Sequence, residues 1–151
     1  RAGLPQEAAA FGDVILIAVP YGALPQLGHD YAPLMKGKVV IVDFFATWCG
    51  PCMAAIPHNN ELLQKYKDKG LIIVGVCTSK SGQEKMSAVA QDKGIQYPTA
   101  RDAKLKSEKA WQVHYYPTYA VVDRKGIVRS VGLQPHNVEK VVKKLLAEPA
   151  S

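Results

Sequence analysis

Two cysteines separated by two residues are the part of this sequence best suited to chemistry. Cys49 and Cys52 lie in the segment TWCGPC, which directly follows the apolar run KVVIVDFFA. Two thiols at this spacing can form and break a disulfide by thiol–disulfide exchange, in which a thiolate attacks one sulfur of a disulfide. Paired cysteines also supply half of many zinc sites. The motif therefore poses a choice among a redox pair, a metal half-site and two inert buried thiols.

The expected position of Cys49 favours the redox pair. We predict that a buried strand ends at Ala46 and that a helix begins at the cysteines. Unpaired N–H groups and the helix dipole stabilise an anion at a helix N-terminus, which lowers a thiol pKa below its usual value of about 8.5. Pro51 fits the first helical turn, where its missing N–H is not needed. We therefore expect Cys49 to be the nucleophile and Cys52, deeper in the helix and more buried, to be the resolving thiol.

The alternatives find less support in the rest of the sequence. A zinc site would need a second CxxC or a pair of closely spaced histidines. What remains is Cys77 and four scattered histidines, namely His29, His58, His114 and His136. Three cysteines are also too few for a disulfide scaffold. We expect no metal, and we expect Cys77, at the end of an apolar run, to fill the core. Inert burial of Cys49 and Cys52 stays open as the other reading.

Short apolar runs alternate with helical patterns along the chain, which indicates an α/β fold. The predicted strands are residues 13–19, 38–46 and 71–77, followed by a hairpin of TYAVVD and GIVRSVGL that turns at Asp123 and Gly126. The predicted helices are residues 22–35, a helix from the cysteines to about Gly70, residues 83–93, residues 104–112, and a C-terminal helix with Val138, Val141, Val142, Leu145 and Leu146 on one face. We expect the order βαβαβα(α)ββα, with parallel strands first and an antiparallel hairpin after them.

Length and charge narrow the class of protein further. A chain of 151 residues with 48% hydrophobic residues suits one soluble domain. The net charge is +6, but the lysines are scattered among acidic and core positions, so we expect no nucleic-acid partner. No apolar run reaches the roughly 18 residues needed to span a bilayer. Because residue 1 is Arg, we expect a trimmed or processed chain, and its compartment stays open.

The segment VDFFATWCGPC resembles the active-site segment of thioredoxins and thioredoxin-like thiol–disulfide oxidoreductases, over about residues 38–146. The resemblance implies a three-layer α/β/α fold around a mixed five-stranded sheet. It also implies that Asp43 is a buried carboxylate that accepts and returns the proton of the resolving thiol. Burial would raise the pKa of Asp43 and suit it to this task. The alternative for Asp43 is a hydrogen-bonded carboxylate with no catalytic role.

The same resemblance implies a substrate groove beside the two cysteines. Pro57 matches the proline that kinks the active-site helix, and Pro117 matches a cis proline whose loop faces the dithiol. Trp48 matches the tryptophan beside the dithiol, with simple packing as its alternative. The implied substrate-binding residues are Trp48, Gly50, Pro51, Tyr116 and Pro117. The implied partners are protein disulfides or dithiols, with no cofactor beyond the Cys49–Cys52 disulfide and a monomeric protein.

Three features depart from plain thioredoxin. The segment GIQYPTARDAKLKSEKAWQV lengthens the chain before Pro117, as in larger, often membrane-tethered bacterial oxidoreductases, some of which serve cytochrome maturation, so extracytoplasmic relatives are common. Tyr116 is bulky for the position before the proline, so substrate preference does not transfer. Thioredoxins place a lysine on the third strand, where Gly75 and Val76 stand here, and we expect the pKa of Asp43 to rise further without that cation.

Residues 1–41 resemble a different family. The stretch GDVILIAVPYGALPQL is similar to part of a Rossmann domain in NADP-binding oxidoreductases related to deazaflavin-dependent reductases. The chain has no G-x-G-x-x-G loop, so we expect no nucleotide binding. We hypothesise a chimera, engineered or fused, in which residues 1–41 form a β-α-β unit that completes one domain of residues 1–151. In the competing functional reading, the chain is a structural chimera whose redox motif is inherited and has no dedicated role.

Overall fold

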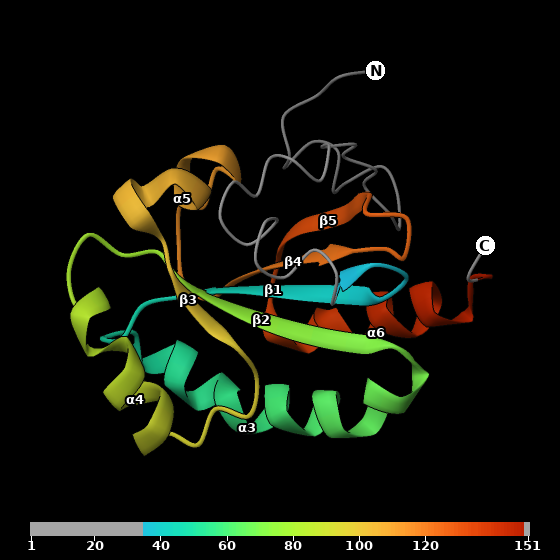
Figure 1. The fold of residues 1–151 in the computed structure, drawn as a ribbon, viewed down its shortest axis with the longest axis horizontal. Helices are drawn as coiled ribbons and strands as arrows, with labels where there is room; N and C mark the ends of the chain where they lie inside the picture. Colours follow the sequence, from blue (N-terminus) through green and yellow to red (C-terminus); the bar gives the residue numbers. More distant parts are fainter. Residues whose placement is uncertain (1–34, 150–151) are drawn as a thin grey trace.

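A mixed five-stranded β-sheet forms the centre of the fold in this computed structural model, which describes residues 35–149 (Figure 1). Its strands are β1 (Val39–Phe45), β2 (Leu71–Cys77), β3 (Thr99–Arg101), β4 (Thr118–Val122) and β5 (Val128–Leu133). They lie in the order β3-β2-β1-β4-β5. β1 pairs in parallel with β2, and β2 with β3, whereas β4 runs antiparallel to both β1 and β5. The sequence-based prediction of an α/β fold with a mixed five-stranded sheet is therefore confirmed.

Helices cover both faces of this sheet. They are α3 (Gly50–Tyr66), α4 (Met86–Asp92), α5 (Lys106–Ala110) and α6 (Pro135–Ala147). Figure 1 shows α3 and α6 on one side of the sheet and α5 on the other. Because successive side chains of a strand point to opposite faces, β1 contributes to two separate cores. Val39 and Ile41 pack with α3 and α6, whereas Val40, Val42 and Phe44 pack with Trp111, which follows α5.

The C-terminal half of the sheet follows the predicted pattern closely. The β4–β5 hairpin turns at Asp123, whose carboxylate accepts the backbone N–H groups of Lys125 and Ile127. Gly126 takes the positive φ of 79° that this turn requires. Helix α6 buries Val138, Val142 and Leu145 against the sheet, as its apolar spacing predicts.

Two parts of the fold differ from the prediction. Strand β3 lies in a segment for which no strand was predicted, because three residues, two half-buried and one exposed, give no usable alternation. The predicted helix over residues 104–112 shrinks to α5, because Lys104 and Leu105 adopt positive φ angles of 59° and 54°. The strand predicted over residues 13–19 and the helix predicted over 22–35, apart from Met35, lie outside the described residues.

Gly75 occupies a crowded position in the middle of β2. A Cβ atom there would lie 3.1 Å from the Thr99 side chain and 3.2 Å from the rings of Phe45 and Tyr97. We expect Gly75→Ala to lower the free energy of unfolding by about 1–3 kcal/mol, because the core would be overpacked.

Urea denaturation measures this loss, and Gly50→Ala provides the control. A Cβ atom at Gly50 would meet no other atom within 4 Å. The control should change stability by less than about 1 kcal/mol. Equal losses in the two variants would contradict the crowding of Gly75.

Candidate active site

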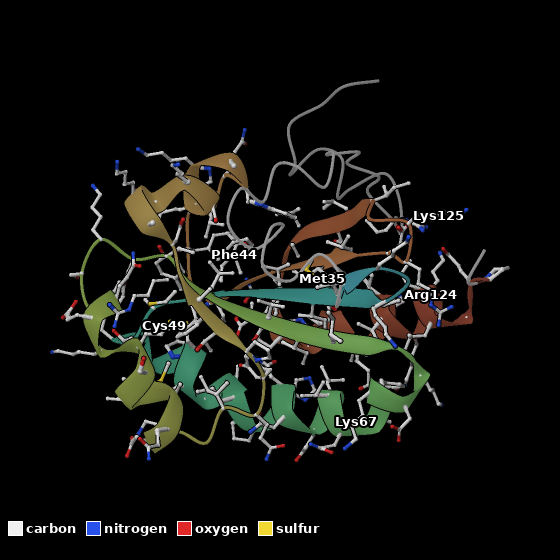
Figure 2. The ribbon with its side chains drawn as sticks, in the orientation of Figure 1. Met35, Phe44, Cys49, Lys67, Arg124 and Lys125 are labelled. Carbon is white, nitrogen blue, oxygen red and sulfur yellow. A yellow bond between two sulfur atoms is a disulfide. The ribbon has the colours of Figure 1, made fainter. Side chains whose placement is uncertain are left out.

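Cys49 and Cys52 form a disulfide at the start of α3 (Figure 2). Cys49 is the N-cap residue of this helix, with extended backbone angles, and its Sγ accepts the backbone N–H of Cys52 at 3.1 Å. Pro51 lies in the first turn, as expected. The predicted position of Cys49 is therefore confirmed. The sulfur lies where the helix presents unpaired donors, which would stabilise a thiolate once the disulfide is reduced.

Both cysteines are buried to the same extent in this disulfide form. Cys49 is 5% exposed and Cys52 is 4% exposed, so the predicted difference in burial is very small in this state. The reason is that both sulfurs pack in one cluster with Phe45, Ala46 and Met86. Cys77 belongs to the same cluster as a free, fully buried thiol, and burial raises its pKa, as expected for an unreactive core cysteine.

Tyr116, which precedes Pro117, lies beside the disulfide. The peptide bond between them is cis, as the resemblance implied. Tyr116 packs against the cysteine cluster and meets Trp48 edge to face, with 5.9 Å between the ring centroids. Trp48 itself is 62% exposed, so it is a surface aromatic and not part of the core. The structure thus brings Trp48 and Tyr116 together beside the two cysteines, with Pro117 next to Tyr116 in the chain.

Polar contacts that the sequence analysis did not identify fix the Tyr116 side chain. Its hydroxyl accepts a hydrogen bond from the Thr78 hydroxyl at 3.0 Å and donates one to the Glu108 carboxylate. Burial and this carboxylate raise the pKa of Tyr116 to about 12, so the hydroxyl stays protonated and keeps its role as a donor. Glu108 lies in α5, and the lengthened segment before Pro117 therefore helps to shape the surface beside the disulfide.

Asp43 lies on β1 and is 3% exposed. Its Oδ2 accepts two hydrogen bonds, one from Asn59 Nδ2 and one from the Tyr97 hydroxyl, each at 3.1 Å. Its Oδ1 has no hydrogen-bond partner among the described residues. None of the ion pairs in residues 35–149 includes Asp43. The carboxyl group is thus held from one side only, by neutral donors.

Burial raises the pKa of Asp43 to about 7, although the hydrogen bonds from Tyr97 and Asn59 act in the opposite direction. Desolvation is the largest contribution, because the anion loses its water without gaining a cation. The predicted upward shift is confirmed. A carboxyl group with this pKa can both take up and release a proton near neutral pH.

The residues around Asp43 were missed by the sequence analysis. Asn59 is a buried polar residue on the apolar stripe of α3, and its Oδ1 accepts a hydrogen bond from the Tyr119 hydroxyl at 3.2 Å. Its Nδ2 also lies within hydrogen-bond distance of the hydroxyls of Tyr97 and Tyr119. The one available signal was Asn59 itself, a polar residue three positions after Ile56 on a stripe that should be apolar.

Neither a membrane-spanning helix nor a cluster of metal ligands occurs in the part of the chain that the structure describes. Within residues 35–149, no helix is long and apolar enough to cross a bilayer. The same residues contain no group of three or more His, Cys, Asp and Glu side chains that could hold a metal ion.

The fold and the site together define a class of protein. A mixed sheet between helices, a disulfide at the N-terminus of the helix after the central strand, and a cis proline directly before β4 are the features of thioredoxin-like proteins. The chain belongs to the Redoxin family, whose pattern matches residues 29–146.

Individual relatives agree with this class. Protein DipZ of Mycobacterium tuberculosis (strain CDC 1551 / Oshkosh) is 37% identical over 119 residues, which cover 74% of this chain and 17% of DipZ. Thiol-disulfide oxidoreductase ResA of Bacillus anthracis is 35% identical over 94 residues, which cover 62% of this chain and 54% of ResA. The chain therefore spans less than a fifth of DipZ and about half of ResA.

Solved structures give the same fold. A thiol:disulfide interchange protein of the thioredoxin family from Chlorobium tepidum TLS superposes with a TM-score of 0.66 at 26% sequence identity. The match covers 77% of this chain and 85% of the other.

The raised pKa of Asp43 makes stability depend on pH. In the unfolded chain this carboxyl group ionises near pH 4, whereas in the folded protein it ionises only near pH 7. The unfolded state therefore binds fewer protons between these values, and stability falls as the pH rises from about 4 to 7, then levels off. Asp43→Asn, which imitates the neutral acid, should lack this fall and exceed the wild type by up to about 4 kcal/mol above pH 7.

Urea unfolding of the disulfide form at several pH values between 4 and 8 checks this expectation. Stability curves for wild type and Asp43→Asn that run parallel across this range would contradict the raised pKa.

Proposed function

We propose that this protein is a thiol–disulfide oxidoreductase that acts by exchange at Cys49 and Cys52. The observation that carries the proposal is the disulfide in which Cys49 caps α3 and its sulfur faces the backbone N–H of Cys52. Membership of the Redoxin family and the printed names of ResA and the Chlorobium protein support the same chemistry.

The exchange proceeds in two balanced steps when the dithiol form reduces a substrate. The Cys49 thiolate attacks one sulfur of the substrate disulfide, which forms a mixed disulfide and releases a substrate thiolate. Cys52 then loses its proton and attacks Cys49 Sγ. This second attack closes the Cys49–Cys52 disulfide, releases the second substrate thiolate and completes the transfer of two electrons to the substrate. The reverse sequence oxidises a substrate dithiol.

Asp43 is the proposed acceptor of the Cys52 proton. Its pKa of about 7 lets it hold the proton during the second step and return it afterwards. Its Oδ1 has no hydrogen-bond partner among the described residues, so one carboxylate oxygen is available for the proton.

Protein disulfides or dithiols are the proposed substrates. Trp48 supplies an exposed aromatic surface, and Gly50, Pro51, Tyr116 and Pro117 complete the substrate-binding surface near the disulfide. The electrons reside in the two sulfurs, so the reaction needs no further cofactor. A monomeric state, and a function without nucleotide or nucleic acid, remain predictions from the sequence.

The chimera hypothesis also remains a prediction. It concerns residues 1–41 as a Rossmann-derived part of one domain of residues 1–151, and most of that segment lies outside the described residues. The Redoxin match begins at residue 29 and so overlaps the end of that segment.

Reduction of insulin disulfides in the presence of dithiothreitol tests the proposed activity. Cys49→Ser should slow the reaction to the rate of dithiothreitol alone, because the nucleophile is lost. Cys52→Ser should accumulate a mixed disulfide between Cys49 and substrate, detectable by mass spectrometry. Cys77→Ala is the matched control, since Cys77 has no role in the exchange, and it should keep the activity. A Cys49→Ser protein as active as the wild type would refute the proposal.

Trp48 should affect large substrates more than small ones. Trp48→Ala removes an exposed aromatic surface beside the disulfide and should raise KM for insulin roughly fivefold, as the loss of about 1 kcal/mol of contact predicts. Its rate with a small disulfide such as oxidised glutathione should stay within about twofold of the wild type. Equal losses with both substrates would argue against a role of Trp48 in protein binding.

A further inference from the structure

Tyr97 occupies space that a side chain on β2 would otherwise fill. Gly75 lies opposite Asp43 in the β1–β2 register. Its missing Cβ would lie 3.2 Å from Tyr97 Cε2, so the ring of Tyr97 packs directly over the glycine. From this position the Tyr97 hydroxyl reaches Asp43 Oδ2 at 3.1 Å. The absence of a side chain at Gly75 thus admits a tyrosine hydroxyl as a partner of the buried carboxylate.

The two oxygens of Asp43 have different surroundings. Oδ2 receives donors from Tyr97 and Asn59, whereas Oδ1 receives none from the described residues. The Asn59 amide presents its NH₂ group to the carboxylate, while its own oxygen accepts the Tyr119 hydroxyl. An NH₂ group can only donate, so an acid proton on Oδ2 would face a donor and is disfavoured there. The stable place for a proton on this carboxyl group is therefore Oδ1.

We propose that Tyr97 is a positioning residue for proton transfer at the dithiol. Together with Asn59 it holds Asp43 through Oδ2, so that the proton of Cys52 enters and leaves at Oδ1. This inference rests on the proposed function and adds which oxygen works and what keeps it in place.

The proton-transfer step can be written with all atoms accounted for. The S–H bond of Cys52 breaks and an O–H bond forms at Asp43 Oδ1. The Cys52 thiolate attacks Cys49 Sγ, and the electron pair of the mixed disulfide leaves with the substrate thiolate. The proton then passes from Oδ1 to solvent or to that thiolate. Tyr97 keeps its own proton throughout, because burial and the neighbouring Asp43 raise the pKa of its hydroxyl.

The residues that hydrogen-bond Asp43 or lie opposite it in the strand register are all neutral. Helix α3 supplies Asn59, the segment before β3 supplies Tyr97, β2 places Gly75 beside it, and β4 places Tyr119 opposite it in the register. Among these groups, Tyr97 and Asn59 are the ones that stabilise the anion, and Tyr97 does so more strongly. Removing the Tyr97 hydroxyl should therefore make Asp43 harder to ionise.

Tyr119 provides a matched control in the same network. It is a buried tyrosine whose hydroxyl contacts Asn59, and its hydrogen bonds do not include Asp43. Tyr97→Phe and Tyr119→Phe each remove one buried hydroxyl and keep the ring. They differ in whether the lost hydroxyl bonded the carboxylate.

The first test is a titration of the Asp43 carboxyl carbon by ¹³C NMR in the full chain with the disulfide formed. Tyr97→Phe should raise the Asp43 pKa by about one unit, and Tyr119→Phe should move it by less than half as much. An unchanged pKa in Tyr97→Phe would overturn the proposal. So would equal shifts in the two variants, because Tyr97 would then act only as one part of a general packing network.

The second test follows the release of substrate from a mixed disulfide preformed on Cys49, at several pH values. In Tyr97→Phe the midpoint of the pH profile should move upward with the Asp43 pKa, whereas Tyr119→Phe should keep the profile of the wild type. If the mixed disulfide forms and resolves with the same profile in wild type and Tyr97→Phe, the positioning role fails while the proposed function stands. If Cys49 forms no mixed disulfide, the proposed function itself fails.

Discussion

The burial of Asp43 without a cation is the constraint on which the site depends. β1 is the central strand, paired on both sides and covered by α3, so it carries the carboxyl group into a place where ionisation is costly. The same strand then delivers the chain to Cys49 within four residues of its end, where α3 begins. One rigid strand therefore sets the position of both the acid and the disulfide. The helix that covers the acid also donates a backbone N–H to the Cys49 sulfur.

Two opposing effects suit this arrangement to exchange near neutral pH. Burial raises the pKa of the Asp43 carboxyl group toward that of a thiol. The ordinary values are several units apart, so this shift reduces the free energy needed to pass the Cys52 proton to Asp43. The hydrogen bonds of Tyr97 and Asn59 moderate the effect of burial, so that Asp43 titrates near pH 7 and does not remain protonated at all working pH values.

The features that were predictable from the sequence are those encoded locally. The helix start at Cys49, the hairpin turn at Asp123 and the buried face of α6 each depend on residues a few positions apart, and each was predicted. The partners of Asp43 were not, because Asn59 is 16 residues away and Tyr97 is 54 residues away in sequence. Strand β3, which follows Tyr97, was also missed, since three residues without a buried position carry no periodic signal.

The pH dependence of the reduction potential tests the coupling of Asp43 to the dithiol most directly. Redox titration against glutathione should show one two-electron transition, with a midpoint that falls by about 59 mV per pH unit when two protons accompany two electrons. If Asp43 exchanges a proton with Cys52, its pKa should be higher in the dithiol form than in the disulfide form. Reduction then takes up additional protons near and above pH 7, and the slope should steepen there. Asp43→Asn should lose this steepening. Identical slopes in wild type and Asp43→Asn across that range would contradict the account.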